Sequence, residues 1–162
     1  HVYRQIIADA KEYLYITTPY LIIDETLISS LTLAAKSGVD VRIITPHHWD
    51  KRLVHMTTRS YYRTLMDGGV KIYEYTPGFI HSKTFVSDGR VATVGTVNLD
   101  FRSLYLHFEC GVRMYDCRAV DAVRRDFLAT MAQSHEMKPE ELKNSFLHRL
   151  FCDVLRLFAP LM

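Results

Sequence analysis

The segment HSKTFVSDGRVATVGTVN, residues 81–98, contains three polar side chains that together could act on a phosphate ester. His81 and Lys83 are two positions apart in a run of strand character, and side chains at that spacing on a strand point to the same face. A neutral imidazole can attack phosphorus, while an ammonium and a carboxamide can stabilise the charge on the phosphoryl oxygens. We therefore predict that His81, Lys83 and Asn98 converge on one concavity at the edge of a sheet.

The spacing of the whole segment is more informative than the histidine and lysine alone. An isolated H-x-K pair is most often an ordinary polar pair on an edge strand. Here Asp88 and then the run GTVN, residues 95–98, follow the pair. This pattern resembles the HKD signature of the phospholipase D superfamily. Three longer segments extend the resemblance, over nearly the whole chain, to the C-terminal catalytic half of bacterial cardiolipin synthases: ITTPYLIIDETL, TRSYYRTLMDGGVKIYEYTPGFIHSKTFVSD and VGTVNLDFRSLYLHFECGV.

The resemblance implies a role for each residue of the signature. His81 would be one of two catalytic histidines, of which one attacks phosphorus and the other protonates the leaving alkoxide; the sequence does not decide between these roles. Lys83 and Asn98 match phosphate-binding positions, and Thr96 matches a small hydroxyl position beside them. Their roles would be electrostatic.

Two carboxylates complete the set of candidate residues. Glu109 matches a family carboxylate that orients the catalytic imidazole, although a solvent-facing strand residue is an equally good interpretation from sequence alone. Asp88 is the third letter of the HKD signature and is counted among its catalytic residues. We expect it to serve architecture, because a turn aspartate can cap backbone donors.

The chain should carry half of an active site. In the superfamily, two such motifs meet across a two-fold or pseudo-two-fold axis. The other histidines have no lysine two positions later, namely those at positions 1, 47, 48, 55, 107, 135 and 148. The missing half would be the other HKD half of a longer chain, or a second copy if the domain acts alone.

The resemblance implies an enzyme that transfers a phosphatidyl group between two phosphatidylglycerol molecules, releases glycerol and forms a phosphohistidine intermediate. No metal or other cofactor and no nucleic acid is expected. We expect the full-length protein at a bacterial cell membrane surface, with this domain soluble and facing the cytoplasm. The alternative is a homodimeric nuclease or phosphodiesterase, for which a net charge of +2 gives weak support. A non-catalytic half is disfavoured because His81, Lys83 and Asn98 are all present.

Composition favours one domain spanning residues 1–162, because a chain of this length with 48% hydrophobic residues can bury a substantial core. The chain begins at His1 without a methionine, which indicates a fragment of a longer protein. Cysteines 110, 117 and 152 lack the spacing of a zinc site or a disulfide framework. Apolar runs are all shorter than the roughly 18 residues of a membrane span.

Helical and strand patterns alternate along the chain, which predicts an α/β/α sandwich with a mixed, mainly parallel central sheet. A hairpin is expected where Asp88-Gly89 joins two strands. We expect helices at 2–12, 24–38, 49–69, 117–135 and 139–157, and strands at 13–19, 39–46, 70–75, 81–88, 90–96 and 107–115.

Three other features lie outside the signature. His47, His48 and Trp49 follow a strand end, where α/β sheets often hold their sites, and are interpreted as loop residues bordering the pocket. Four aromatic residues either border an acyl-chain groove or fill the core, the commoner role: Tyr20, Phe79, Phe101 and Tyr105. One apolar stripe on the last helix either packs on the sheet, the commoner case, or lies on a membrane: Phe146, Leu147, Leu150, Phe151, Val154, Leu155 and Phe158.

Overall fold

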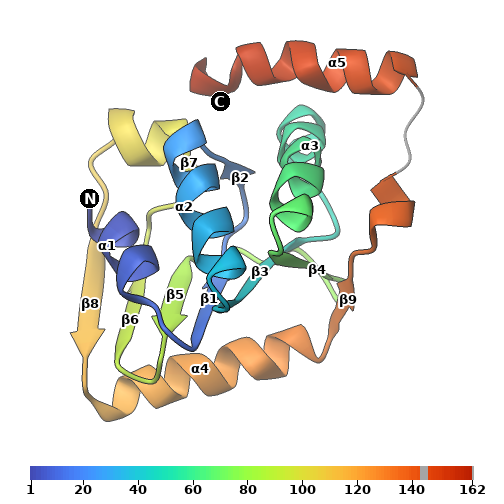
Figure 1. Ribbon diagram of the computed structural model, residues 1–162. Helices are drawn as coiled ribbons and strands as arrows, with labels where there is room; N and C mark the ends of the chain where they lie inside the picture. The colour runs from blue at the N-terminus through green and yellow to red at the C-terminus, as the bar shows by residue number, and fades with distance from the viewer. Residues whose placement is uncertain (143–145, 162) are drawn as a thin grey trace.

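The computed structural model describes residues 1–142 and 146–161, in which a mixed sheet separates two layers of helices (Figure 1). The strand order in this part of the chain is β8-β6-β5-β1-β3-β4-β9. The strands of this sheet are β1 (Tyr13–Thr17), β3 (Asp40–Pro46), β4 (Lys71–Tyr75), β5 (Thr84–Ser87), β6 (Val91–Gly95), β8 (Gly111–Tyr115) and β9 (Ser134–Glu136). The short strands β2 (Leu21–Ile22) and β7 (Leu99–Asp100) pair with each other in a separate ribbon.

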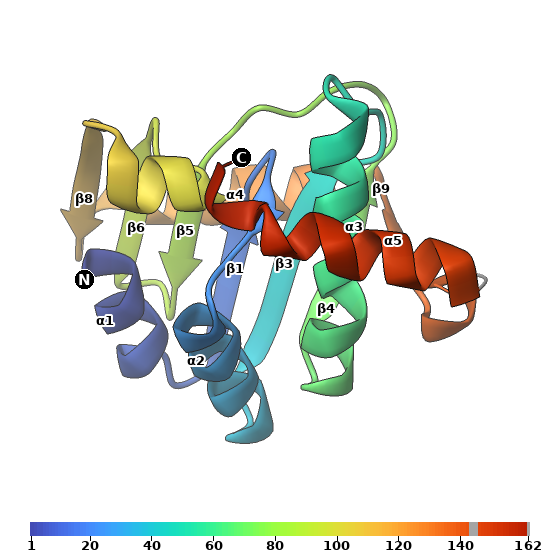
Figure 2. The ribbon, with the colours of Figure 1, turned by 90° about the horizontal axis from the view of Figure 1, so that it is seen from above.

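Helices cover both faces of the sheet. One face carries α1 (Val2–Asp9), α2 (Glu25–Lys36) and α3 (Arg52–Asp67), and the other carries α4 (Arg118–Met131) (Figures 1 and 2). Alternation along β1 fills both interfaces: Leu14 and Ile16 enter the larger core, while Tyr13 and Tyr15 enter the core beneath α4. Both cores are needed because the central strands present apolar residues on each side.

The α/β/α sandwich with a mixed sheet is confirmed, but fewer strands pair in parallel than the predicted mainly parallel sheet would have. β1, β3 and β4 pair in parallel because α2 and α3 return the chain to the same end of the sheet. The pairs of β5 with β1, β6 with β5, β8 with β6 and β9 with β4 are antiparallel. Parallel pairing is thus limited to the centre of the sheet.

The predicted hairpin forms, and Asp88 anchors its turn. Asp88 has φ of 54° and Gly89 has φ of 65°, which are left-handed conformations that these two residue types tolerate. The Asp88 carboxylate accepts hydrogen bonds from the backbone N–H groups of Lys11, Glu12 and Tyr13 at 2.8, 3.0 and 2.9 Å. It therefore ties the turn between β5 and β6 to the beginning of β1.

Several boundaries differ from the sequence expectation. The helix predicted over 117–135 ends at Met131, and the polar run Ser134–Glu136 instead pairs with the open edge of β4. The strand predicted over 107–115 begins only at Gly111, preceded by the π-helix η1 (Arg102–Leu106). The polar run Ser134–Glu136 has no hydrophobic period of its own, so its pairing with β4 decides its conformation.

The predicted last helix starts as the 3₁₀ turn η2 (Pro139–Leu142) and resumes as α5 (Phe146–Leu157), before the short turn η3 (Ala159–Leu161). Figure 2 shows α5 lying across α3, so it packs on a helix and not on the sheet. Cys152 and Leu155 are buried, whereas four stripe residues are exposed: Leu150, Phe151, Val154 and Phe158. The side chains of Phe146 and Leu147 lie outside the described residues.

Candidate active site

Most of the signature lies in chain segments at one end of the sheet, where the parallel strands finish; this end is called the site edge. The parallel strands β1, β3 and β4 end at this edge. β5 runs antiparallel to β1, with Thr84 opposite Thr17, so the residues before β5 lie there too. β6 ends and β8 begins at the same edge, with Gly95 opposite Gly111. The segments holding His81, Lys83, Thr96, Asn98 and Glu109 therefore meet at one side of the molecule.

His81 and Lys83 contact each other directly. Lys83 Nζ lies 3.0 Å from His81 Nδ1 and donates to the His81 carbonyl at 2.6 Å. Burial, followed by the charge of Lys83, lowers the pKa of His81, and burial likewise lowers the pKa of Lys83. This environment favours the neutral imidazole, which is the form that a nucleophile requires.

The spacing in the sequence predicts that His81 and Lys83 meet because side chains two positions apart on a strand share a face. That reason is wrong, because neither residue lies within the strand. β5 begins at Thr84, which pairs with Thr17, the last residue of β1. His81 and Lys83 meet through the conformation of the loop that precedes β5.

Two of the four predicted aromatic residues flank His81. The Tyr20 ring lies edge-on at 6.5 Å and the Phe79 ring at 5.8 Å, between ring centroids. Tyr20 donates its hydroxyl hydrogen to Asp50 Oδ2 at 2.5 Å, and burial raises the pKa of this phenol. The other two, Phe101 and Tyr105, pair with each other at η1, 5.8 Å apart. Tyr20 and Phe79 thus form the walls around the imidazole.

Thr96 and Glu109 form a pair at the ends of β6 and β8. The Thr96 hydroxyl donates to Glu109 and accepts from the backbone N–H of Cys110 at 3.0 Å. Gly95 permits this approach, because a Cβ there would lie 2.5 Å from the Cys110 carbonyl oxygen. The hydrogen bond from Thr96 lowers the pKa of Glu109.

The contact expected between Glu109 and His81 is not among the hydrogen bonds of the described residues. The Glu109 carboxylate accepts a hydrogen bond from Thr96 instead, and His81 Nδ1 is in contact with Lys83 Nζ. Glu109 instead acts on Lys83 through its charge, which favours the ammonium form. Glu109 is therefore a counter-charge to Lys83 and not a support of the His81 ring in this structure.

Asn98 sits between β6 and β7. Its Oδ1 atom is buried and has no hydrogen-bond partner among the described residues. The next residue, Leu99, is fixed by pairing with Leu21 and by a 3.2 Å bond from its N–H to Thr18 Oγ1. An unsatisfied buried amide oxygen costs about 1–3 kcal/mol, and only a hydrogen-bond donor can recover that cost. Its convergence with His81 and Lys83 stays a prediction.

Asp88 lies at the opposite end of β5 from this edge. The four residues of β5 separate it from Lys83, so the two residues are five steps apart, a span of about 16 Å at the usual rise. Its carboxylate is engaged by three backbone N–H groups of the β1 segment. Counting Asp88 among the catalytic residues is therefore not supported by its position, whereas its bonds match the architectural role.

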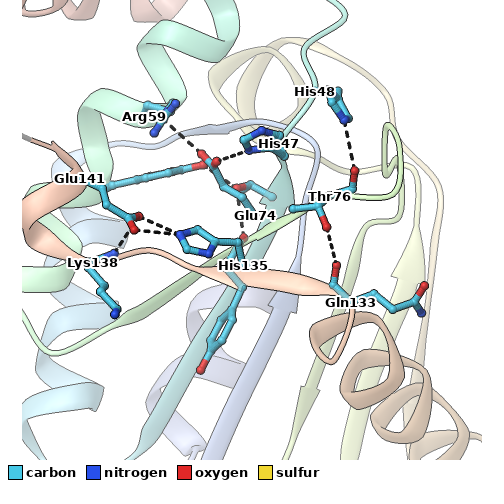
Figure 3. Close-up of polar contacts among 12 residues, drawn as sticks. His47, His48, Arg59, Glu74, Thr76, Gln133, His135, Lys138 and Glu141 are labelled. Atoms are coloured by element: carbon cyan, nitrogen blue, oxygen red, sulfur yellow. Dashed lines mark hydrogen bonds and ion pairs between the residues drawn. The ribbon is translucent and has the colours of Figure 1, made fainter.

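A second polar cluster lies at the same edge (Figure 3). Its histidines, His47 and His48, were placed near the pocket from sequence, but their partners were missed. Glu74, only 1% exposed, accepts from His47 Nδ1 at 2.8 Å and faces Arg59 Nε at 3.3 Å. His48 Nε2 lies 3.2 Å from the Thr76 carbonyl oxygen. A single carboxylate within the apolar strand of β4 was the available signal. Within the described residues, no group of three or more histidine, cysteine or acidic side chains could hold a metal ion.

Comparison with solved structures supports the fold. The chain matches phosphatidylserine synthase from Haemophilus influenzae with a TM-score of 0.76 at 16% identity, covering 99% of this chain and 44% of that one. It matches Nuc, a phospholipase D family member from Salmonella typhimurium, with a TM-score of 0.73 at 15% identity, covering 85% and 89%. At these identities the likeness concerns the fold alone.

Comparison with curated sequences is more specific. The chain is 39% identical to a cardiolipin synthase of Halalkalibacterium halodurans and 40% identical to cardiolipin synthase 2 of Bacillus anthracis, over 99% and 100% of its length. It spans about a third of each of these relatives, 32% in both cases. Residues 3–131 match the family described as cardiolipin synthase, PLD-like domain. The chain therefore belongs to the cardiolipin synthase family of phospholipase D-like domains.

Proposed function

We propose that the protein containing this chain makes cardiolipin from two phosphatidylglycerol molecules, and that residues 1–162 are a single domain supplying one half of its active site. The observation that carries the proposal is the 3.0 Å contact between Lys83 Nζ and His81 Nδ1 in a chain of this family. A neutral imidazole beside a cation is suited to meeting a phosphodiester anion. The relatives named cardiolipin synthase support the substrate class.

Lys83 would release the ring when substrate binds. A phosphodiester oxygen is a stronger acceptor for the ammonium than a neutral ring nitrogen, because the hydrogen bond is then between opposite charges. When the Lys83 ammonium moves away from His81, Nδ1 is free to carry the ring proton, and the lone pair of Nε2 can then face phosphorus. Asn98 would add an uncharged donor, its side-chain amide, to the same oxygens, whereas the Thr96 hydroxyl would have to release the Glu109 carboxylate first.

Transfer then takes two displacements. In the first, one motif histidine forms a bond to phosphorus, the bond from phosphorus to glycerol breaks, and the other motif histidine protonates the leaving glycerol oxygen. In the second, a hydroxyl of another phosphatidylglycerol attacks phosphorus, gives its proton to that second histidine and displaces the first. The ester bond broken and the ester bond formed are alike, so this exchange requires no external energy source. His81 takes one of the two histidine roles.

The second half of the site would approach beside η1 and β8. Large apolar side chains there are exposed: Tyr105, Leu106, Phe108 and Val112. β8 is the edge strand next to Glu109, and an uncovered apolar edge favours a protein partner. The other HKD half of the longer chain is the partner that the mechanism requires.

The test uses the full-length protein with phosphatidylglycerol in detergent micelles, excess chelator and no divalent metal. We expect cardiolipin and glycerol in equal amounts. The alternative, a homodimeric nuclease or phosphodiesterase, would appear as chelator-resistant hydrolysis of a substrate such as DNA without cardiolipin. Binding to vesicles of phosphatidylglycerol, compared with neutral vesicles, tests the proposed membrane location.

A further inference from the structure

The mechanism above does not use the cluster around Glu74. Its carboxylate is 1% exposed and holds two cationic or potentially cationic groups, His47 Nδ1 at 2.8 Å and Arg59 Nε at 3.3 Å. A buried carboxylate is costly unless it is paired, and Arg59 already supplies a counter-charge. The further bond to His47 is therefore not needed for charge balance, yet it fixes one imidazole in a defined orientation.

That orientation leaves one ring nitrogen available. Because the carboxylate accepts from Nδ1–H, the neutral ring of His47 keeps its lone pair on Nε2. The side chain of His47 is 46% exposed, so solvent reaches the ring although the buried carboxylate of Glu74 holds Nδ1 (Figure 3). A histidine with Nδ1 on a buried carboxylate and Nε2 open is arranged to accept a hydrogen bond from a hydroxyl group.

His47 lies at the same end of the sheet as His81. His47 follows β3, which is separated from β5 only by β1, so the two strand ends lie about 10 Å apart. Asp50, in the same loop as His47, accepts from the Tyr20 hydroxyl, and the Tyr20 ring flanks His81. A substrate bound at His81 and extended along this edge would meet His47.

We propose that His47, fixed by Glu74, binds the alcohol acceptor of the second displacement by accepting a hydrogen bond from its non-reacting hydroxyl. This inference rests on the proposed function and concerns the acceptor class, a polyol head group such as the glycerol of phosphatidylglycerol. One hydroxyl of that glycerol attacks phosphorus and loses its proton to the second motif histidine. The other hydroxyl keeps its proton and donates to His47 Nε2. His47 takes no part in bond making.

The neighbouring histidine provides a matched control. His48 follows in the same loop, and its ring lies 5.1 Å from that of His47. Its Nε2 is placed against the Thr76 carbonyl, and within the described part of the chain no carboxylate bonds to it. Replacing either residue by alanine removes one exposed imidazole. Only His47→Ala removes an imidazole that a buried carboxylate orients.

The experiment lets two acceptors compete for one phosphoenzyme. Full-length protein receives phosphatidylglycerol in micelles with a fixed concentration of ethanol, and the ratio of cardiolipin to phosphatidylethanol is measured. Ethanol has a single hydroxyl, so it has no second group for His47 to hold. We expect His47→Ala to lower the ratio about five- to tenfold, the value of one hydrogen bond. His48→Ala should change it less than twofold, and His47→Gln, which keeps an acceptor atom, should restore part of it.

The outcomes separate the two proposals. A ratio within twofold of wild type in His47→Ala would overturn the acceptor site while leaving phosphatidyl transfer intact. An equal fall in His48→Ala would also overturn it, because the loop and not the Glu74-held ring would then be responsible. Absence of both phospholipid products in the wild-type protein would refute the proposed function and this inference with it. Glu74→Gln, checked for folding by circular dichroism, should also lower the ratio of cardiolipin to phosphatidylethanol, as His47→Ala does.

Discussion

Replacement of Asp88 tests whether the third residue of the signature stabilises the fold or takes part in the chemistry. The change to alanine removes three hydrogen bonds, to the backbone N–H groups of Lys11, Glu12 and Tyr13. At about 1 kcal/mol each for bonds that water can partly replace, their loss amounts to about 3 kcal/mol. Alanine at φ of 54° adds about 1 kcal/mol of left-handed strain. We expect the free energy of unfolding to fall by about 4 kcal/mol.

Asp88→Asn is the matched variant. Asparagine tolerates the left-handed conformation and keeps one oxygen for Glu12 and Tyr13, which both donate to Oδ1, but it loses the acceptor for Lys11. A loss of about 1 to 2 kcal/mol follows. Urea unfolding of the 162-residue chain, followed by circular dichroism and by the fluorescence of its single tryptophan, measures both values. A variant that is as stable as wild type, or a stable Asp88→Asn protein whose full-length form makes no cardiolipin, would refute the architectural role.

Three further predictions concern the site edge. His81 should titrate below the ordinary 6.5 in proton NMR, because burial and then Lys83 lower its pKa; the neutral ring persists to lower pH, and a midpoint above 6.5 would contradict this environment. Gly95→Ala should cost about 2 kcal/mol or more of stability in urea unfolding, because its Cβ would press on the Cys110 carbonyl, and an unchanged midpoint would argue against the close approach. Glu109→Gln should lower cardiolipin formation about 10- to 100-fold without abolishing it, since its carboxylate supports Lys83 by charge; complete loss would indicate a direct chemical role.

Much of the architecture could be predicted because apolar residues recur at clear intervals in the central strands and helices. β1, β3 and β4 are short apolar runs separated by amphipathic helices, and the turn at Asp88-Gly89 has one favoured geometry. β9 could not be predicted, because Ser134–Glu136 has no strand pattern and pairs only where β4 leaves an edge open. The π-helix Arg102–Leu106 follows β7, a strand whose partner β2 is far away in the sequence.

The site was predictable as a set of residues but not as a set of contacts. The spacing of His81 and Lys83 indicated that they act together, yet the strand argument failed because β5 begins one residue after Lys83. The partner of Glu109 was assigned by resemblance, and a neighbouring hydroxyl, that of Thr96, takes the carboxylate instead. The pairing of His47 with Glu74 joins two strand ends that are 27 residues apart, which no local pattern reveals.

The central claim is that His81 is one of the two histidines that carry out phosphatidyl transfer. The direct measurement is cardiolipin formation from phosphatidylglycerol by full-length His81→Ala, with chelator present and with His135→Ala as a control at a histidine that instead bonds Glu141. Because a methyl group can neither bond to phosphorus nor protonate an alkoxide, we predict a loss of about 10⁴ or more in His81→Ala. The control should keep its activity. Cardiolipin formation by a folded His81→Ala protein at a rate near that of wild type would contradict the account.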